Sequence, residues 1–324
     1  MGGKTHLVQT GDVMDRGPRA KDILDLIRRL EKEAAAAGGM VHFLIGNHEE
    51  LNIIKGAFRY NYIPIKQFKD FLPADYVAAK EERFKEKAGN GGDLTKLWDE
   101  TWNDKSVQRL YTRTFNKDYG RWIAEHNAVI KINDTVFLHA GFSEQFSNWK
   151  LETINAVLTK ELKNNIDDID SFIGEANSLG NARIVNKSQG PLWYRDLVMK
   201  EQDLMQEEFD RILANLGAKS MVVAHTPLSS AVSVDYMNRF GNRLFMIDTS
   251  ISSFMGMGEG RPSALIIENG KFRVWPPEDR AARSGRDARG AHPSAKRKVN
   301  HEKDRSGDDG FVDHHLFWEG HPPF

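Results

Sequence analysis

Short apolar runs and one longer amphipathic segment organise the start of this chain. Residues 5–10 and 41–45 are compact apolar runs, which predict two short buried strands. The segment between them has apolar residues at helical spacing: Ile23, Leu24, Ile27 and Leu30. Pro18 suits the first position of that helix, and Gly38-Gly39 suits its end. We therefore predict a strand–helix–strand unit in which each strand stops at a glycine-containing loop.

The segment 51–125 has a different character, because aromatic residues there alternate with dense Lys, Glu and Asp. This pattern predicts two or three amphipathic helices, laid on the domain as an insertion. We expect the aromatic side chains to pack the insertion onto the domain, and a substrate-gripping groove is the alternative. The residues concerned are Phe58, Tyr60, Tyr62, Phe68, Phe71, Tyr76, Phe84, Trp98, Trp102, Tyr111 and Phe115.

The second half of the chain returns to short apolar runs separated by turn residues. Asn133-Asp134 and Asn269-Gly270 are turn pairs, and each predicts a hairpin between the runs beside it. Helices are predicted at about 150–180 and 199–216, with a loop at 190–195 between them. Strands are predicted at 128–131, 135–138, 221–224, 231–234, 244–247, 264–267 and 272–275.

The composition changes sharply after residue 277. Residues 278–310 are almost all Arg, Asp, Lys, Ser, Gly and Ala, and aromatic residues return only in the last stretch. Such a segment cannot bury enough apolar area to offset its ordering entropy. We therefore predict one domain over residues 1–277, with the helical insertion at about 51–125, and a disordered charged tail over 278–324.

Charge and composition narrow the classes of function. The formal net charge of −1 does not favour nucleic acid or an acidic membrane as a partner. The chain has no cysteine, which excludes disulfides, thiolate catalysis and zinc–cysteine sites. Any metal ion must therefore be held by His, Asn, Asp or Glu. No run suits a membrane-spanning helix or a signal peptide, so we expect an intracellular, cytoplasmic protein. The oligomeric state is not predicted.

Four of the apolar runs are followed by a residue that can bind a metal ion: Asp12, Asn47, His139 and His225. If these strands share a sheet and run in the same direction, their carboxyl ends meet at one edge, where α/β proteins bind ligands. Asp12 can bridge two metals through its two oxygens, and the two imidazoles and the amide oxygen are suitable further ligands. Two divalent ions about 3.5–4 Å apart activate a bridging water and clamp a phosphoryl oxygen in phosphatases.

Other side chains in the same loops suit phosphoester chemistry. His48 is placed to protonate a leaving group, and Asp15 can orient its imidazole. Arg16 and Arg195 supply forked donors for phosphate oxygens. Trp193-Tyr194 is a candidate lining for the pocket, although aromatic residues at such a position more often serve packing.

These residues resemble a known family. Four blocks are similar, in order, to the characteristic motifs of the phosphoprotein phosphatase branch of the calcineurin-like metallophosphoesterases: GDVMDRG at 11–17, GNHE at 46–49, HAG at 139–141 and AHT at 224–226. The loop GPLWYRD at 190–196 and the DTS at 248–250 look more like the bacterial-type members, the Shewanella-like protein phosphatases. The resemblance covers about residues 5–275.

The resemblance implies an α/β fold, specifically a four-layer α-β-β-α sandwich, with a site for two divalent ions (Mn, Fe or Zn). It also implies hydrolysis of phosphomonoesters, above all of phosphoprotein, by a metal-activated hydroxide in one step. It makes Asp12 the bridging ligand, and the ligands that complete the second metal are Asn47, His139 and His225. It makes His48 the general acid and Asp15 its partner, and the phosphate binders are Arg16 and Arg195.

One block of the family pattern is absent from this sequence. The family's first block, G-D-x-H-G, lies some tens of residues before GDVMDRG and supplies an Asp and a His to the first metal. We therefore expect a sandwich that lacks its first strand and a site that retains two metal ions or only one. The spacing D-x-H recurs at Asp313 to His315, but a disordered tail is a poor source of ligands for a buried sheet edge.

Three functions stay open at this point. The first is a metal-dependent phosphatase that acts on phosphorylated proteins. The second is an enzyme with the same site chemistry that acts on a small phosphoester, such as a nucleotide or a dinucleoside polyphosphate. The third is a truncated, catalytically silent member of the family that binds one metal ion or a phosphorylated partner.

Overall fold

The computed structural model describes residues 3–54, 56–59, 62–91, 93–102, 104–167, 184, 187–228, 237–251 and 262–275. These residues all belong to one unit, which spans Met1–Pro277. The tail predicted at 278–324 and the strand predicted at 231–234 lie outside the described residues. Within the described part of the chain, no helix combines the length and the apolarity that crossing a membrane requires.

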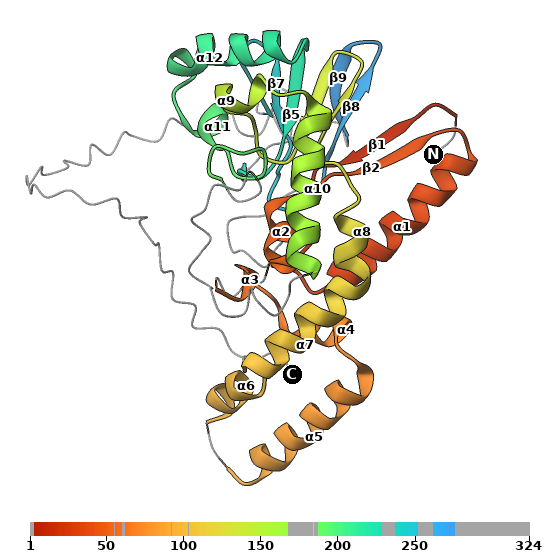
Figure 1. Cartoon of the computed structure of the whole chain (residues 1–324), viewed down its shortest axis with the longest axis vertical. Coiled ribbons are helices and arrows are strands. Elements are labelled where there is room, and N and C mark those ends of the chain that lie inside the picture. Colours follow the sequence, from red (N-terminus) through yellow and green to blue (C-terminus); the bar gives the residue numbers. More distant parts are fainter. Residues whose placement is uncertain are drawn as a thin grey trace, which may run out of the picture. The chain divides into compact units, whose positions relative to one another are not determined.

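The chain opens with the strand–helix–strand unit that its pattern predicts (Figure 1). Strands β1 (His6–Gln9) and β2 (Met40–Phe43) pair in parallel, and helix α1 (Ala20–Ala36) connects them. Leu24 of α1 is fully buried in the main core. Gly38 follows the end of the helix with φ of +81°, which is the left-handed conformation typical of a helix C-terminus.

Two details of this unit differ from the prediction. Helix α1 begins at Ala20 and not at Pro18, because the loop before it continues through Arg19, whose φ of −120° and ψ of 19° are not helical. Strand β1 is not buried as a whole, and Leu7 is 38% exposed. The reason is that β1 pairs with β2 alone among the described strands, so one edge of this sheet stays open.

A mixed sheet of five strands follows, in the order β3-β4-β5-β7-β6. Its strands are β3 (Val129–Ile132), β4 (Thr135–Leu138), β5 (Ser220–Val223), β6 (Asn238–Arg239) and β7 (Leu244–Met246). β4, β5 and β7 run parallel, whereas β3 and β4 form the predicted hairpin with Asn133 at φ of 53°. β4 and β5 are buried along their whole length, as expected for short apolar strands covered on both faces.

A third sheet packs against the second. The hairpin of β8 (Ala264–Glu268) and β9 (Lys271–Trp275) turns at Asn269-Gly270, as predicted. Phe272 of this hairpin stacks on Phe245 of β7, with ring centroids 4.0 Å apart. The cluster around these rings also includes Leu44, Phe137, Val222 and, at its margin, Val8. Strands of different sheets therefore pack face to face through one apolar layer.

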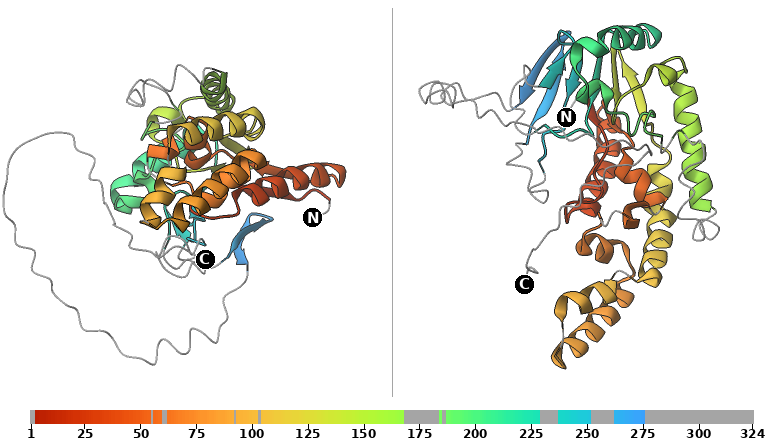
Figure 2. Two further views of the ribbon diagram at one scale, coloured as in Figure 1. Left: turned by 90° about the horizontal axis from the view of Figure 1, so that it is seen from below. Right: turned by 90° about the vertical axis from the view of Figure 1, so that its left-hand side faces the viewer.

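Helices complete the layers. α9 (Glu144–Ser147), α10 (Leu151–Asp167), α11 (Asp196–Met199) and α12 (Gln202–Asn215) follow the strands in sequence. Figure 2 shows α10, in yellow-green, alongside the strands, and its Leu158 and Leu162 are buried in the main core. The protein is thus an α/β fold, as predicted. Helix α12 starts later than the prediction of 199, because Lys200 and Glu201 have extended backbone between α11 and α12.

The insertion holds more helices than the two or three predicted. Its elements are α2 (Asn47–Ile53), α3 (Gly56–Arg59), α4 (Ile65–Phe71), α5 (Ala74–Gly89), α6 (Leu94–Trp102), α7 (Lys105–Phe115), the π-helical turn η1 (Asn116–Gly120) and α8 (Arg121–Ile123). Pro64, Pro73 and Asp104 each start a new helix and so divide the segment. Helices α5 and α6 lie side by side (Figure 1). Phe68, Phe71, Tyr111 and Phe115 pack together, as expected for most of the aromatic residues.

Candidate metal and phosphate site

Two glycine loops, one after β1 and one after β2, pass very close to each other at the base of the site. A Cβ on Gly11 would lie 2.5 Å from the backbone nitrogen of Gly46, and a Cβ on Gly46 would lie 2.5 Å from that of Asp12. Only glycine permits this approach. Asp12, Asp15 and Arg16 also have φ values of 59°, 67° and 53°, in the left-handed region that such residues rarely adopt. Strain of this kind is characteristic of functional loops.

Glu49 fastens the two loops together. Its Oε2 accepts hydrogen bonds from the backbone N–H groups of Asp12 (2.8 Å) and Gly46 (2.9 Å). Its Oε1 accepts from the backbone N–H groups of Val13 (2.8 Å) and Met14 (3.0 Å). The carboxylate is fully buried and compensates for four donors that would otherwise lack partners. Sequence analysis missed this role, although a Glu three residues after the residue that caps a helix is a recognised signal.

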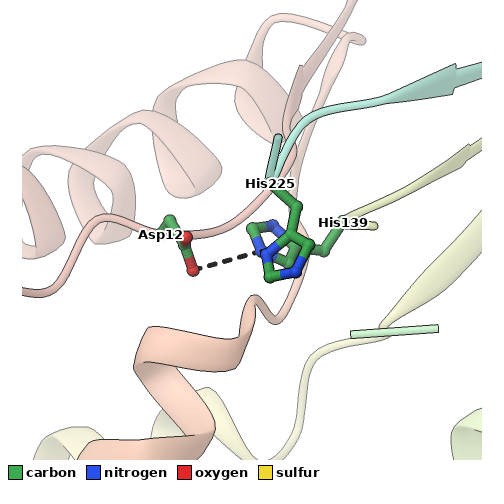
Figure 3. A group of neighbouring side chains, drawn as sticks. All are labelled: Asp12, His139 and His225. Atoms are coloured by element: carbon green, nitrogen blue, oxygen red, sulfur yellow. Dashed lines mark hydrogen bonds and ion pairs between the residues drawn. The ribbon is translucent and has the colours of Figure 1, made fainter. Parts of the chain in front are cut away.

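The four predicted metal ligands come together where strand ends meet. Asp12 and Asn47 follow β1 and β2, while His139 and His225 follow β4 and β5. The condition that all four strands share one sheet is not met among the described strands, because β1–β2 and β4–β5 belong to two separate ladders, as a sandwich of two sheets allows. Each pair is parallel, so the carboxyl ends still converge. Figure 3 shows Asp12, His139 and His225 pointing toward one another from these ends.

Distances around His139 define the centre of this cluster. Its Nε2 lies 2.9 Å from Oδ1 of Asn47, 3.0 Å from Nδ1 of His225 and 3.3 Å from Oδ1 of Asp12. Its Nδ1 lies 2.7 Å from the carbonyl oxygen of Thr10, which can only accept, so Nδ1 carries the ring proton. In the neutral ring, Nε2 then carries a lone pair, which faces the oxygen and nitrogen atoms of these three neighbours.

This donor set suits a divalent cation. The carboxylate, the amide oxygen and the two imidazoles are nitrogen and oxygen ligands for ions such as Zn²⁺, Mn²⁺ or Fe²⁺. Asp12, His139 and His225 each offer a ligand atom, and these atoms lie within 4.8 Å of one another. The buried Nε2 of His225 also finds no hydrogen-bond partner among the described residues. Lone pairs that converge without protons to share are stabilised by a bound cation.

The electrostatics of the cluster favour the metal-binding protonation states of Asp12 and His225, and they shift the pKa of His139 in the opposite direction. Burial raises the pKa of Asp12, but the neighbouring His139 and His48 rings outweigh burial and lower it well below its ordinary value. Burial, His139 and Arg195 together lower the pKa of His225 to about 2. Burial alone would lower the pKa of His139, but the Asp12 carboxylate outweighs it and raises the pKa. Asp12 is therefore a carboxylate and His225 a neutral imidazole.

His48 and Asp15 form the predicted pair beside the cluster. Nδ1 of His48 lies 2.7 Å from Oδ2 of Asp15, and both side chains are buried. Since the carboxylate accepts, the His48 ring donates from Nδ1 and turns its Nε2 the other way. That Nε2 lies 4.0 Å from Oδ2 of Asp12, so it faces the metal cluster. The backbone N–H of His48 also donates to Oδ1 of Asp12, at 3.0 Å.

The two predicted phosphate-binding arginines contact different groups near this cluster. Arg195 donates from Nη1 to the carbonyl oxygen of His225 (3.0 Å) and to the hydroxyl of Thr226 (3.2 Å). Burial lowers the pKa of Arg195, and the positive charge of Arg16 contributes to the same direction, so the two guanidinium groups are electrostatic neighbours. Arg16 lies over the ring of Tyr62, with 4.9 Å from its Cζ to the ring centroid.

The two aromatic residues next to Arg195 have different surroundings. Trp193 packs edge-on against the ring of His225, with centroids 5.9 Å apart, and donates from Nε1 to Glu50. Tyr194 is buried, and its hydroxyl donates to Glu208 of α12 at 2.8 Å. Trp193 therefore borders the site, whereas Tyr194 packs within the core.

Sequence analysis missed three polar residues that surround Asp15. Asn52 donates to both carboxylate oxygens of Asp15, at 3.0 Å each. Gln67 donates to Oδ1 of Asp15 at 3.0 Å, and Tyr111 donates to Asn52 at 2.7 Å. Asn52 could have been found, because it lies four residues after His48 on the same face of α2. No local signal identifies Gln67 or Tyr111, which come from α4 and α7 of the insertion.

Known proteins resemble this chain in sequence and in structure. The sequence profile described as calcineurin-like phosphoesterase matches residues 2–229. Shewanella-like protein phosphatase 1 of Plasmodium berghei is 28% identical over 283 residues, which cover 85% of this chain and 65% of that protein. Shewanella-like protein phosphatase 2 of Arabidopsis thaliana is 29% identical over 165 residues, which cover 48% of this chain and 41% of that protein.

One solved structure with the same fold is the crystal structure of a cold-active protein-tyrosine phosphatase from a psychrophilic Shewanella species. The TM-score is 0.57 at 26% sequence identity, and the match covers 84% of this chain and 67% of that one. An uncharacterized protein of Schizosaccharomyces pombe is 28% identical over 256 residues, 78% of this chain and 63% of that protein. The chain thus spans less than two thirds of the length of its relatives from Schizosaccharomyces pombe and Plasmodium berghei.

Proposed function

Since this chain belongs to the calcineurin-like phosphoesterase family, we propose that it is a metal-dependent phosphatase that hydrolyses phosphomonoesters. The observation that carries the proposal is the convergence of Asp12, Asn47, His139 and His225 beside the His48–Asp15 pair. Metal ligands, a proton donor and guanidinium groups gathered at strand ends are the parts that phosphoester hydrolysis needs.

Asp12, Asn47, His139 and His225 would hold a divalent ion, with Asp12 as the ligand able to share a second one. A bound ion supplies Lewis-acid chemistry, which polarises a phosphoryl oxygen and favours the deprotonated form of water. Among the described residues, Asp12, His139 and His225 form the one group of nearby acidic and histidine ligands large enough for an ion. We therefore propose that the described residues hold one ion, and that Mn²⁺, Zn²⁺ and Fe²⁺ are the candidates.

The other site residues act on the phosphoester itself. Arg16 and Arg195 would bind the phosphate oxygens, because a guanidinium forms forked, charge-assisted hydrogen bonds. His48 would donate a proton from Nε2 to the leaving oxygen, since that nitrogen faces the metal cluster. Asp15 would keep the His48 ring in this orientation by accepting from Nδ1. These roles stay predictions until the variants are measured.

The substrate that we propose is a phosphorylated protein. The names of the relatives support this class, since the proteins of Plasmodium berghei and Arabidopsis thaliana are named protein phosphatases and the Shewanella protein a protein-tyrosine phosphatase. The domain that we assign to this activity is residues 1–277, and the segment at about 51–125 is its helical insertion. A small phosphoester is the second candidate, because the same metal and arginine chemistry serves both classes.

A substrate panel tests the proposal. The Mn²⁺-loaded full chain is offered an aryl phosphate, phosphotyrosine and phosphoserine peptides, and a dinucleoside polyphosphate. We expect hydrolysis of the aryl phosphate and of at least one peptide, and little hydrolysis of the dinucleotide. Asp12→Asn should abolish hydrolysis, whereas Asp22→Asn, an equivalent change on exposed α1, should not. Activity that survives Asp12→Asn would overturn the mechanism, and activity on the dinucleotide alone would overturn the substrate class.

A further inference from the structure

We infer that Gln67 and Tyr111, both from the helical insertion, are positioning residues that hold Asp15 and His48 in their working geometry. The inference rests on the proposed function, because it gives His48 the task of protonating the leaving group. It adds a role for the insertion: α4 and α7 supply buried polar side chains that fix the orientation of the proton donor.

The contacts form a closed polar network around the carboxylate of Asp15. Gln67 binds Asp15 twice: its Oε1 accepts from the Asp15 backbone N–H at 2.9 Å, and its Nε2 donates to Oδ1 at 3.0 Å. The same Nε2 lies 2.9 Å from the Tyr111 hydroxyl oxygen and 3.2 Å from Oδ1 of Asn52. The Tyr111 hydroxyl donates to Oδ1 of Asn52 at 2.7 Å, and Asn52 donates to both oxygens of Asp15.

The direction of each hydrogen bond follows from two groups with a single role: the Asp15 carboxylate can only accept, and the Asp15 backbone N–H can only donate. Because the carboxylate needs donors, the amide of Asn52 turns its NH₂ group toward Asp15, and its Oδ1 accepts the Tyr111 proton. Because Oε1 of Gln67 accepts the Asp15 backbone N–H, its NH₂ group likewise faces the carboxylate. Both amides thus present only donors to the Asp15 carboxylate, and Oδ2 accepts from Nδ1 of His48 at 2.7 Å as well as from Asn52 at 3.0 Å. Tyr111 therefore completes the network by donating to Oδ1 of Asn52 and accepting from Nε2 of Gln67, which holds both amides against the carboxylate that orients the His48 ring.

Burial makes this network rigid. Asn52 and Tyr111 are fully buried, Gln67 is 1% exposed, and the Asp15 side chain is fully buried. Rings of the insertion enclose Tyr111: Phe58, Phe68, Phe71 and Phe115 all lie with centroids within 6.0 Å of its own. Apolar side chains would fill such a space at lower cost if packing were the only requirement, because buried polar groups need complete hydrogen bonding. The polar atoms instead converge on one carboxylate beside the site.

Leaving-group dependence distinguishes a positioning role from a structural one. Tyr111→Phe removes the hydroxyl with little change of shape, and Gln67→Met is a second variant that keeps the length of the side chain. Tyr119→Phe is the matched control, because its hydroxyl lies in the same insertion but donates to Asp25 of α1. Each Mn²⁺-loaded variant is assayed with an alkyl, a phenyl and a dinitrophenyl phosphate, whose leaving groups need a proton to decreasing degrees. Thermal unfolding confirms that each variant is folded.

We expect Tyr111→Phe to lower kcat on the alkyl phosphate by about tenfold, which is part of the roughly 10²–10⁴-fold that general acid catalysis contributes. On dinitrophenyl phosphate, kcat should change by less than about twofold, because that leaving group departs without a proton. KM should stay constant, since the phosphate contacts are not altered. Two results would overturn the positioning role. One is an equal loss of kcat on all three substrates, and the other is an unchanged kcat on the alkyl phosphate in both Tyr111→Phe and Gln67→Met.

A second readout separates this inference from the proposed function. Proton NMR of the Zn²⁺-loaded chain detects the ring N–H of His48, assigned by its loss in His48→Gln. The signal should persist in wild type and Tyr119→Phe, and shift or broaden in Tyr111→Phe. An unchanged signal in Tyr111→Phe would overturn the inference even in an active enzyme. A wild-type chain without activity on any phosphate would overturn the proposed function, while the NMR comparison would still report on the network.

Discussion

Nε2 of His139 faces Nδ1 of His225 at 3.0 Å, and both rings are buried at the carboxyl ends of neighbouring parallel strands. His139 donates its ring proton from Nδ1 to the carbonyl oxygen of Thr10, so a neutral ring has a lone pair directed at His225. Burial lowers the pKa of His225 to about 2, so this ring is neutral. Two imidazole lone pairs beside a carboxylate are stabilised by a cation, and this relationship is the physical basis of the proposed metal site.

Arg195→Lys tests phosphate binding. The variant keeps the positive charge but loses the planar fork that binds the His225 carbonyl and can bind phosphate oxygens. We expect KM for an aryl phosphate and the inhibition constant of inorganic phosphate to rise by about tenfold, the usual value of one charge-assisted hydrogen bond. Steady-state kinetics with Arg19→Lys, an exposed arginine of the loop before α1, provide the control. Equal constants in both variants would remove Arg195 from the phosphate site.

Glu49→Gln should destabilise the protein through the two glycine loops. The glutamine side chain of the variant would keep one acceptor oxygen. Its NH₂ group would face backbone N–H groups that donate to the second carboxylate oxygen in wild type. We expect the free energy of unfolding to fall by about 3 kcal/mol, since buried donors lose a charged acceptor. Urea denaturation measures the change, and Glu33→Gln on the exposed face of α1 should cost less than about 0.5 kcal/mol. A loss in Glu49→Gln no larger than in this control would contradict the assigned contact.

The carboxylate of Asp104, in the insertion, should make a pH-dependent contribution to the stability of the protein. Partial burial raises the pKa of Asp104, but hydrogen bonds from Lys80, Ser106 and Val107 outweigh it and lower the pKa to about 2. A carboxyl group with a lowered pKa in the folded state stabilises fully above its ordinary value of 3.8 and loses this effect as pH falls through 2.

Asp104→Ala should therefore cost about 1 kcal/mol at pH 7, because an N-cap is removed and the partly exposed ion pair is screened by solvent. The difference in unfolding free energy between wild type and Asp104→Ala should shrink as the pH falls from the ordinary pKa of 3.8 to the lowered pKa of about 2. Urea denaturation at pH 7 and in this window measures it. A constant difference across the whole range would show that the carboxylate charge does not contribute.

The candidate ligands of the site could be proposed from sequence because each is encoded locally. Asp12, Asn47, His139 and His225 each follow a short apolar run, and the end of such a run is visible without knowledge of the fold. The apolar runs alone do not show how those strands are distributed over the two sheets, because pairing between distant strands depends on tertiary packing. The four side chains converge although their strands lie in two sheets, since the direction of the strands matters more than their membership of one sheet.

The residues under Asp15 show where local patterns stop being informative. Gln67 lies on an amphipathic helix between Lys66 and Phe68, where the pattern alone does not tell a buried amide from a solvated one. It is 1% exposed and binds Asp15, which is 52 residues away in the sequence. Tyr111 shares the aromatic composition of the whole insertion, so nothing distinguishes its hydroxyl from those of residues that only pack. Contacts of this kind follow from the fold and not from the spacing.

Metal binding by the full chain tests the central claim most directly. Isothermal titration with Mn²⁺ compares wild type with Asp12→Asn, and Asp22→Asn on α1 is the matched control. We predict that wild type and the control bind the ion equally, and that Asp12→Asn binds it about a hundredfold more weakly or not at all, because even the loss of an outer partner of a ligand costs about 10–100-fold. Absence of binding in wild type, or equal affinity in Asp12→Asn, would contradict the metal site and the phosphatase mechanism that depends on it.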